Sequence, residues 1–109
     1  MNKRFRIKKN QEFSKIISYK HSVSSANFIV YYTDKTEAVS RVGISVSKKL
    51  GDAVTRNRIK RQIREMIREL IDFEKCPKDL IVIARKAFLD NDYHSNKNDL
   101  EKALKKAII

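Results

Sequence analysis

The sequence predicts a single α+β domain with the element order α-β-β-β-α-β-α and a central four-stranded mixed sheet on which the helices pack. Two runs rich in β-branched and aromatic residues, 27–33 and 41–47, precede a long helical pattern at 53–71, and another β-type run, 80–84, follows it. The chain has 109 residues, 41% of them hydrophobic, with only two Gly and one Pro. This length and composition indicate one compact domain over residues 1–109.

The amino-terminal region combines a basic segment with a short helix. Residues 1–9, MNKRFRIKK, are expected to be flexible, and no apolar stretch follows them that would make a secretory signal. Asn10 is expected to cap a helix over residues 11–19, because its short side chain can accept a hydrogen bond from a free N–H group of the first turn. Phe13 and Ile17 are four residues apart and therefore share one face of this helix.

The strands are predicted from composition and from the turns between them. Runs 27–33 and 41–47 are expected to be strands, and 34–40 is interpreted as a hairpin connection between them. A further short strand is considered within 23–26. The run 80–84 is continuously apolar, which is typical of a strand buried on both faces, and it could pair in parallel with 41–47.

The helix expected at 53–71 has the most regular pattern in the chain. Asp52 is suited to cap its start, and Gly51 suits a sharp corner between strand and helix. The apolar residues that recur at helical spacing and form one buried stripe are Ile59, Ile63, Met66, Ile67 and Leu70. A last helix is expected to start near Asp92 and to pack its apolar residues on the core.

The charged residues of the 53–71 helix are sorted by its geometry. The residues that fall on one flank of the stripe are Asn57, Lys60, Arg61, Arg64 and Arg68. Glu65 and Glu69 fall on the opposite flank, with Arg58 and Gln62. The residues that add positive charge near the helix start, where the backbone dipole favours anions, are Lys48, Lys49, Arg56 and Arg58. A solvated surface helix is the alternative, but the asymmetric sorting favours an anion-binding face.

The overall charge points to a polyanionic partner. The chain has 25 Lys and Arg against 13 Asp and Glu, a net charge of +12. Nucleic acid is the leading partner, and an anionic membrane surface is second, because a basic amphipathic helix can lie on lipid. The apolar stripe lacks Trp, and core packing explains it better. Since the longest apolar run, 80–84, is far too short to cross a bilayer, a cytoplasmic protein is expected.

Residues that could perform catalysis are few. His21 and His94 are isolated, without the spacing of a metal-ligand pair. Asp90, Asp92 and Asp99 could form a two-metal nuclease cluster, and the alternative is that they are loop, cap and helix-surface residues. The second reading is preferred, so neither catalytic residues nor a metal site are expected in the protein.

Aromatic residues on short elements support nucleic-acid binding. Tyr31 and Tyr32 are neighbours on a predicted strand, so their side chains must point to opposite faces of the sheet. One ring can enter the core while the other lines a surface groove, where unpaired bases stack on rings. Packing of both rings in the core is the alternative.

The basic helix and its flanking runs also carry a resemblance to a known family. The residues concerned are SVSKKLGDAVTRNRIKRQIREMIRE, followed by DLIVIARK, and the most specific portion is KKLGDAVTRNRIKR, built around residues 56–58. In these residues the chain closely resembles the bacterial ribonuclease P protein subunit. The similarity extends through nearly the whole chain and includes RFRIKKNQEF, ANFIVYYT, RVGISVS and DYHSNKNDLEKAL.

The resemblance implies an accessory subunit of a ribonucleoprotein endoribonuclease, a hydrolase that removes the 5′ leader from precursor tRNA. Its partners would be a catalytic RNA and precursor tRNA, with no membrane, no small-molecule substrate and no oligomer expected. Mg²⁺ bound mainly by the partner RNA would perform the hydrolysis. The resemblance also implies a left-handed crossover that carries the basic helix, contrary to the right-handed default. The alternative kept open is a ribosomal or structured-RNA-binding chaperone without a role in cleavage.

The resemblance assigns roles to particular residues. Those that match the family's RNA-binding helix are Arg56, Asn57, Arg58, Lys60, Arg61 and Arg64, and the charge pattern adds Lys48, Lys49 and Arg68. Phe13, Ile17 and Tyr31 match a central cleft through which the single-stranded leader passes, with Lys48 at its edge. Ile17 occupies a position that is often aromatic, so only apolar contact is expected there.

Overall fold

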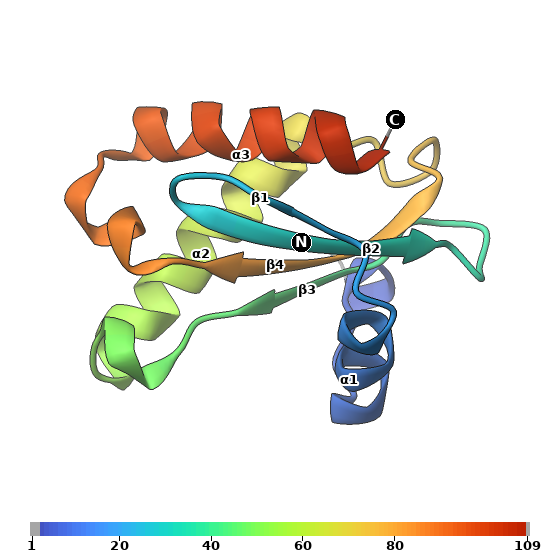
Figure 1. Cartoon of the computed structure of the whole chain (residues 1–109), viewed down its shortest axis with the longest axis horizontal. Coiled ribbons are helices and arrows are strands. Elements are labelled where there is room, and N and C mark those ends of the chain that lie inside the picture. Colours follow the sequence, from blue (N-terminus) through green and yellow to red (C-terminus); the bar gives the residue numbers. More distant parts are fainter. Residues whose placement is uncertain (1–2, 109) are drawn as a thin grey trace.

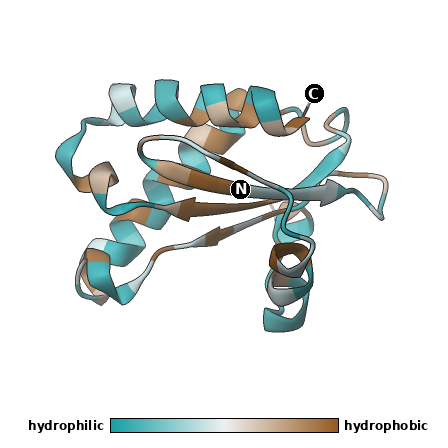
Figure 2. Ribbon diagram, viewed as in Figure 1, coloured by the Kyte–Doolittle hydropathy of each residue, from teal (hydrophilic) through white to brown (hydrophobic). Residues whose placement is uncertain are grey.

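The computed structural model describes residues 3–108, and within them the predicted element order is confirmed (Figure 1). The helices and strands are α1 (Asn10–Ser18), β1 (Ser22–Ser24), β2 (Phe28–Asp34), β3 (Val42–Ser45), α2 (Ala53–Leu70), β4 (Lys78–Ala84) and α3 (Tyr93–Ile108). Short 3-10 turns occur at Lys3–Phe5, Lys48–Leu50 and Lys86–Asp90. Figure 2 shows hydrophobic residues concentrated in the sheet and hydrophilic residues along the helices.

The sheet is four-stranded and mixed, as predicted, with the strand order β1-β2-β4-β3. β2 is antiparallel to β4, and β3 is parallel to β4, so the expected parallel pairing is confirmed. The expected hairpin between β2 and β3 is wrong, because β4 lies between these strands. β4 is the most apolar strand. It lies between β2 and β3, and most of its residues are buried. The left-handedness of the β3-α2-β4 crossover stays a prediction.

The connection between β2 and β3 packs across the entry to β4 instead of closing a hairpin. The backbone N–H of Lys35 donates to the carbonyl of Pro77 at 3.1 Å, and that of Ser40 donates to the carbonyl of Phe73 at 2.7 Å. The hairpin of this sheet joins β1 to β2, with Val23 opposite Val30. The short strand considered within 23–26 therefore exists, one residue earlier than expected.

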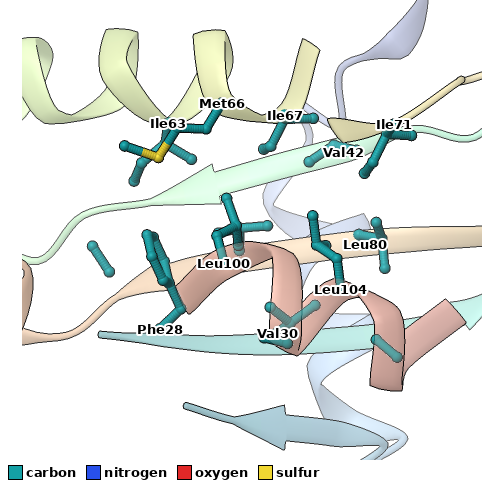
Figure 3. Close-up of a cluster of buried hydrophobic side chains, with 14 of the residues drawn as sticks. Phe28, Val30, Val42, Ile63, Met66, Ile67, Ile71, Leu80, Leu100 and Leu104 are labelled. Atoms are coloured by element: carbon teal, nitrogen blue, oxygen red, sulfur yellow. The ribbon is translucent and has the colours of Figure 1, made fainter. Parts of the chain in front are cut away.

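α2 and α3 cover one face of the sheet and enclose the main core. Side chains from both helices meet those of β2, β3 and β4 (Figure 3), and the labelled members are Phe28, Val30, Val42, Ile63, Met66, Ile67, Ile71, Leu80, Leu100 and Leu104. The predicted stripe of α2 is buried except for Leu70, which is half-buried. Burial of this stripe fixes the rotation of α2, and hence where its cations point.

The start of α2 agrees with the prediction. The Oδ1 atom of Asp52 accepts a hydrogen bond from the backbone N–H of Thr55 at 2.9 Å. Gly51 has a φ of 148°, a conformation that residues with a side chain rarely adopt. The cap and the corner together set the point at which the chain turns from β3 into the basic helix.

In the amino-terminal segment, which was expected to be flexible over residues 1–9, Phe5 and Ile7 pack on the domain and Lys8 and Lys9 are exposed; residues 1 and 2 lie outside the described part, and the flexibility stays a prediction. The ring of Phe5 stacks on Phe73 with centroids 4.4 Å apart, and Ile7 is buried. The N–H of Ile7 donates to the carbonyl of Val42 at 3.1 Å. Two apolar side chains between cations thus anchor the segment along the edge of β3.

This docking also changes the start of α1. The helix begins at Asn10, and Lys9 is the cap residue with extended backbone angles and no side-chain cap hydrogen bond. The expected cap at Asn10 is therefore wrong. The Lys9 carbonyl accepts hydrogen bonds from the N–H groups of Glu12 and Phe13, because the extended segment delivers the chain into the helix one residue early.

A buried polar cluster joins α3 to the β1–β2 turn. Asn96 is 1% exposed, and its side chain accepts a hydrogen bond from the Asn27 amide at 2.9 Å and donates to the Phe88 carbonyl at 3.1 Å. The Oδ2 atom of Asp99 accepts from the hydroxyl of Ser25 at 2.6 Å and from the N–H of Asn27 at 2.9 Å. The turn is thereby fixed to the helix.

Replacing Asn96 with Ala is expected to lower the free energy of unfolding by about 1.5 kcal/mol, because the buried amide of Asn27 loses its acceptor. Urea denaturation of the purified protein measures this change. Asn98→Ala is the matched control, since Asn98 is exposed on the same helix. Equal stability of the Asn96 and Asn98 variants would show that the cluster does not hold α3 in place.

Candidate nucleic-acid interface

The second face of the sheet carries α1 and is only partly covered. Figure 1 shows α1 and α3 on opposite sides of the sheet. A small buried cluster of Ile7, Ile16 and Ile81 lies under α1, and Phe13, Tyr31 and Ile83 pack against it. Tyr32 packs against the main core on the other face, so the predicted opposite orientation of the two tyrosines is confirmed, with Tyr31 on the α1 side.

Next to α1, one row of this face is more open. Ile83 of β4 pairs with Ile29 of β2 on one side and with Ser45 of β3 on the other. These residues are half-buried, whereas Phe28 and Val30 on the covered face are fully buried. Half-buried apolar side chains beside a polar one form a surface on which a base or ribose can rest. Ile29 and Ile83 were not among the predicted cleft residues, although β-strand alternation places them on the face of Tyr31.

Phe13 lies against the sheet because position 43 has no side chain. A methyl group on Gly43 would lie 2.5 Å from the Phe13 Cζ atom and 2.9 Å from the Ile81 Cδ1 atom. Both distances are far below the 3.5–4.0 Å at which carbon atoms attract each other. Gly43 therefore sets how closely the Phe13 ring approaches β3 and β4.

A groove runs from Phe13 towards α2. It has a volume of about 500 Å³ and is lined by the amino-terminal segment, α1, β3 and α2. The lining residues are Ile7, Lys8, Asn10, Phe13, Ser14, Ile44, Ser45, Val46 and Lys60. The groove thus has an aromatic ring at one side, a mixed apolar and polar floor, and cations on its rim, which suits unpaired nucleotides.

The cations of α2 fall into two groups. Arg56, Lys60 and Arg64 are half-buried, whereas Arg58 and Arg61 are exposed. Burial, followed by the charge of nearby Arg6, lowers the pKa of Arg64. Of the predicted basic flank, Lys60 and Arg64 therefore lie beside the amino-terminal segment, whereas Arg61 is exposed, as is Arg58, which was predicted on the opposite flank.

Arg68 differs from the other cations that the sequence pattern grouped with it. Its guanidinium forms an ion pair with Glu65 one turn earlier, and this pair raises the pKa of Arg68. Asn57 is exposed, as are Lys48 and Lys49 in the turn before α2. Because Glu65 already offsets its charge, Arg68 is the cation of this group least suited to bind a phosphate.

Ile17 and Lys48 are two further residues that the resemblance assigns to the cleft, and these assignments stay predictions. Ile17 is half-buried one turn after Phe13, so the two side chains lie on the same side of α1. Lys60, rather than Lys48, lines the groove beside Phe13. Lys48, which the resemblance assigns to the edge of the cleft, is exposed in the turn before α2.

Arg6 and Lys8 are cations of this surface that the sequence interpretation missed. The pattern RFRIK alternates charged and apolar residues, which is typical of an extended segment with one buried side. Ile7 is buried on that side, and Arg6 and Lys8 line a small surface pocket together with Lys60 and Arg64 of α2. The alternation could have revealed this segment as part of the site.

Acidic residues gather on the other side of α1. The guanidinium of Arg41 lies 2.7 Å from Glu12, 3.4 Å from Glu37 and 3.6 Å from Asp79. Burial raises the pKa of Asp79. Burial also acts to lower the pKa of Arg41, but the neighbouring carboxylates outweigh it, so the pKa of Arg41 is raised overall. Acids therefore border one side of α1 and cations the other, which directs a polyanion to the groove.

Two of the three aspartates considered as a nuclease cluster, Asp92 and Asp99, have other partners. Asp92 caps α3 by accepting a hydrogen bond from the N–H of Ser95 at 2.8 Å, and Asp99 holds the β1–β2 turn. Within residues 3–108, no group of three His, Cys, Asp or Glu side chains is placed to hold a metal ion. The same part of the chain contains no helix long and apolar enough to cross a membrane.

Comparison with known proteins assigns the chain to a family. Its sequence matches the family Ribonuclease P over residues 1–108. The ribonuclease P protein component of Bacillus cereus (strain AH187) is 44% identical over 108 residues, which cover 98% of this chain and 94% of that protein. The chain belongs to the ribonuclease P protein family.

Solved structures of ribonuclease P proteins have the same fold. The Staphylococcus aureus RNase P protein matches with a TM-score of 0.82 and 44% identity, over 96% of this chain and 98% of that one. The Thermotoga maritima RNase P protein matches with a TM-score of 0.80 and 30% identity, over 93% of this chain and 96% of that one. The resemblance noted in the sequence is thereby confirmed over nearly the whole chain.

Membership of the family gives the general function. The chain is the protein component of ribonuclease P, a ribonucleoprotein endoribonuclease of tRNA processing, and it binds RNA. This component associates with the RNase P RNA. The choice between this function and a ribosomal chaperone is therefore decided by the family.

Proposed function

We propose that this ribonuclease P protein holds the single-stranded 5′ leader of precursor tRNA in the groove beside Phe13, while the outward cations of α2 bind the catalytic RNA. The observation that carries the proposal is the groove itself, which places an aromatic ring, an apolar floor and Lys60 together on an open sheet face. Rings and apolar floors bind unpaired bases with little sequence preference. A leader of variable sequence suits such a surface.

The catalytic contribution of the protein is then to bind and orient. Basic residues lower the repulsion between leader and catalytic RNA, so both polyanions can approach the cleavage region. In this proposal Mg²⁺ is held mainly by the RNA and supplies the activated water. The chain's own residues position the leader, and more tightly bound substrate keeps the reaction efficient when Mg²⁺ is scarce.

The holoenzyme is expected to bind precursor tRNA more tightly than mature tRNA by roughly tenfold or more, since at least two leader phosphates or bases are contacted. Binding of labelled precursor and mature tRNA to the RNA alone and to the RNA with protein measures this preference. Equal strengthening of both by the protein would rule out leader recognition.

Cleavage assays separate the roles of protein and RNA. We expect cleavage at low Mg²⁺ only with both components, and no cleavage by protein alone. Cleavage by the protein without RNA would instead support a protein-only nuclease.

Phe13→Ala is the variant that tests the groove. It should reduce the preference of the holoenzyme for precursor over mature tRNA without reducing the affinity of the protein for the catalytic RNA.

A further inference from the structure

The helix α1 separates two hollows on its face of the sheet. On one side lies the groove that Asn10 and Phe13 line. On the other side lies a pocket of about 320 Å³, called the outer pocket below, which is lined by α1, the end of β2, the connection between β2 and β3, Arg41 and Asp79. Because α1 has a hollow on each side, close packing does not block its movement across the sheet.

The helix has a small apolar attachment to the sheet. Of its nine residues, all of which the structure describes, Ile16 is the only one that is buried. Lys9, which precedes the helix, supplies no side-chain cap hydrogen bond. A helix of this length is not stable by itself in water. The position of α1 therefore depends on a few contacts with the rest of the domain.

Arg41 makes one of these contacts from the sheet side of the outer pocket. Its Nη1 atom lies 2.7 Å from the Oε2 atom of Glu12, in the first turn of α1. The carbonyl of Arg41 accepts a hydrogen bond from the N–H of Leu80 at 3.0 Å, so residue 41 continues the pairing of β3 with β4. The ion pair thus links α1 directly to the sheet, one residue before Phe13.

Asp79 holds Arg41 in place. Asp79 is 2% exposed, and its Oδ1 atom accepts a hydrogen bond from the N–H of Arg41 at 2.9 Å. Its Oδ2 atom lies 3.6 Å from the Nη2 atom of Arg41, whose side chain is 16% exposed. Since salt screens partly buried charges less than exposed ones, this arrangement gives the ion pair with Glu12 a firm anchor on the sheet.

Arg41 and Gly43 act on the same part of α1. They are two residues apart in an extended chain, so both face the side of the sheet that carries α1. Gly43 lies directly under the Phe13 ring, and it admits the ring because it has no side chain. Arg41 binds the residue before Phe13. Neighbouring positions of one strand therefore limit both the height and the sideways position of the ring.

We infer that Arg41 is a positioning residue for leader recognition, because its ion pair with Glu12 holds α1 and thereby keeps the Phe13 ring in the wall of the groove. The inference rests on the proposed leader recognition. Arg41 lies outside the described residues that line the groove, so it acts through α1 without touching the leader. Loss of the ion pair would let α1 move towards the outer pocket and would take the ring from its place above Gly43.

Glu12→Gln tests this contact and leaves Arg41 beside the buried Asp79. Glu37→Gln is the matched control, because Glu37 lies 3.4 Å from the same guanidinium but in the connection between β2 and β3. Both variants change the net charge equally. Relative to the control, Glu12→Gln is expected to lower the preference of the holoenzyme for precursor over mature tRNA roughly threefold to fivefold, the upper range for a partly exposed ion pair. Equal preferences in the two variants would overturn the inference.

Kinetics distinguish a positioning role from a general loss of structure. In Glu12→Gln the KM for precursor tRNA should rise by the same factor, whereas the single-turnover cleavage rate at saturating holoenzyme should not change. The affinity of the protein for the catalytic RNA should also equal that of the control. A loss of this affinity as large as the loss of precursor preference would mean that the whole domain is disturbed, and the inference would be wrong.

The Phe13→Ala background decides whether Glu12 acts through the ring. In this background Glu12→Gln is expected to cause no further loss of precursor preference, because no ring remains to be positioned. The same loss with and without the ring would show that Glu12 acts independently of Phe13 and would overturn the inference.

Hydrogen exchange of the purified protein keeps the test separate from the proposed function. The amide hydrogens of α1 are expected to exchange roughly threefold to fivefold faster in Glu12→Gln than in Glu37→Gln, because the helix opens more often without the ion pair. If the wild-type holoenzyme did not prefer precursor tRNA, leader recognition would fail, and hydrogen exchange would still decide whether Arg41 holds α1. Equal exchange rates in the two variants would rule out this attachment.

Discussion

Replacing Arg58 and Arg61 with Gln is expected to weaken association of the protein with the catalytic RNA by about 10- to 30-fold at physiological salt. Both side chains are exposed on the outward part of α2, and no carboxylate among residues 3–108 forms an ion pair with either. Each phosphate contact that is lost should reduce the slope of log affinity against log salt by about 0.7–0.9. A salt titration of binding to the catalytic RNA measures both quantities.

Arg68→Gln is the matched control for this prediction. Arg68 is exposed on the same helix, but its charge is already offset by Glu65. We expect its removal to change RNA affinity by less than about threefold, because paired surface charges contribute little. An unchanged slope in the Arg58 and Arg61 variant would mean that this part of α2 is a solvated surface. Since Arg68→Gln removes one charge and the double variant removes two, an equal loss of binding free energy per removed charge would show that affinity follows net charge alone.

The basic helix was predictable from the sequence because its determinants are local. Asp52 contacts a backbone N–H only three residues away, and the buried stripe is a repeat along one element. Such features are set within a few turns of chain. The pairing of Arg68 with Glu65 has the same local origin, yet the sorting of charges by flank overlooked it, since the two residues lie near the boundary between the flanks.

The parallel pairing of β3 with β4 was predicted, but the position of β4 between β2 and β3 was not. β2 and β3 are close in sequence, but β4 separates them because its apolar run gains most from a central position. Such a placement is decided by contacts between segments far apart in the chain. The docking of Ile7 on β3 is non-local in the same way, so the cations beside it were read as a flexible segment.

The sequence predicted which residues lie on the face of the cleft better than it predicted how closely they approach one another. Strand alternation correctly divided Tyr31 from Tyr32, and helical spacing placed Ile17 with Phe13. The distance of the Phe13 ring from the sheet depends on a missing side chain at Gly43, which no periodicity reveals. This contact leads to the second prediction of large effect.

Gly43→Ala is expected to lower the free energy of unfolding by about 2–3 kcal/mol, because the added methyl group overlaps the Phe13 ring and the end of Ile81. The ring must move away from the sheet, which alters the groove that it lines. The preference for precursor over mature tRNA should therefore fall roughly tenfold, if base stacking is worth about 1–3 kcal/mol. Urea denaturation and tRNA binding by the holoenzyme measure the two effects.

A double-mutant cycle with Phe13→Ala separates the overlap from other causes of instability. Without the ring, the nearest remaining atom to the methyl group is the Cδ1 atom of Ile81, which can rotate, so Gly43→Ala should cost less by about 1–2 kcal/mol in this background. The same cost in both backgrounds would show that the ring does not press on β3. Affinity for the catalytic RNA is the internal control, because the outward cations of α2 do not touch this contact. Loss of that affinity together with the precursor preference would mean that Gly43 supports the whole fold and has no particular role in the leader groove.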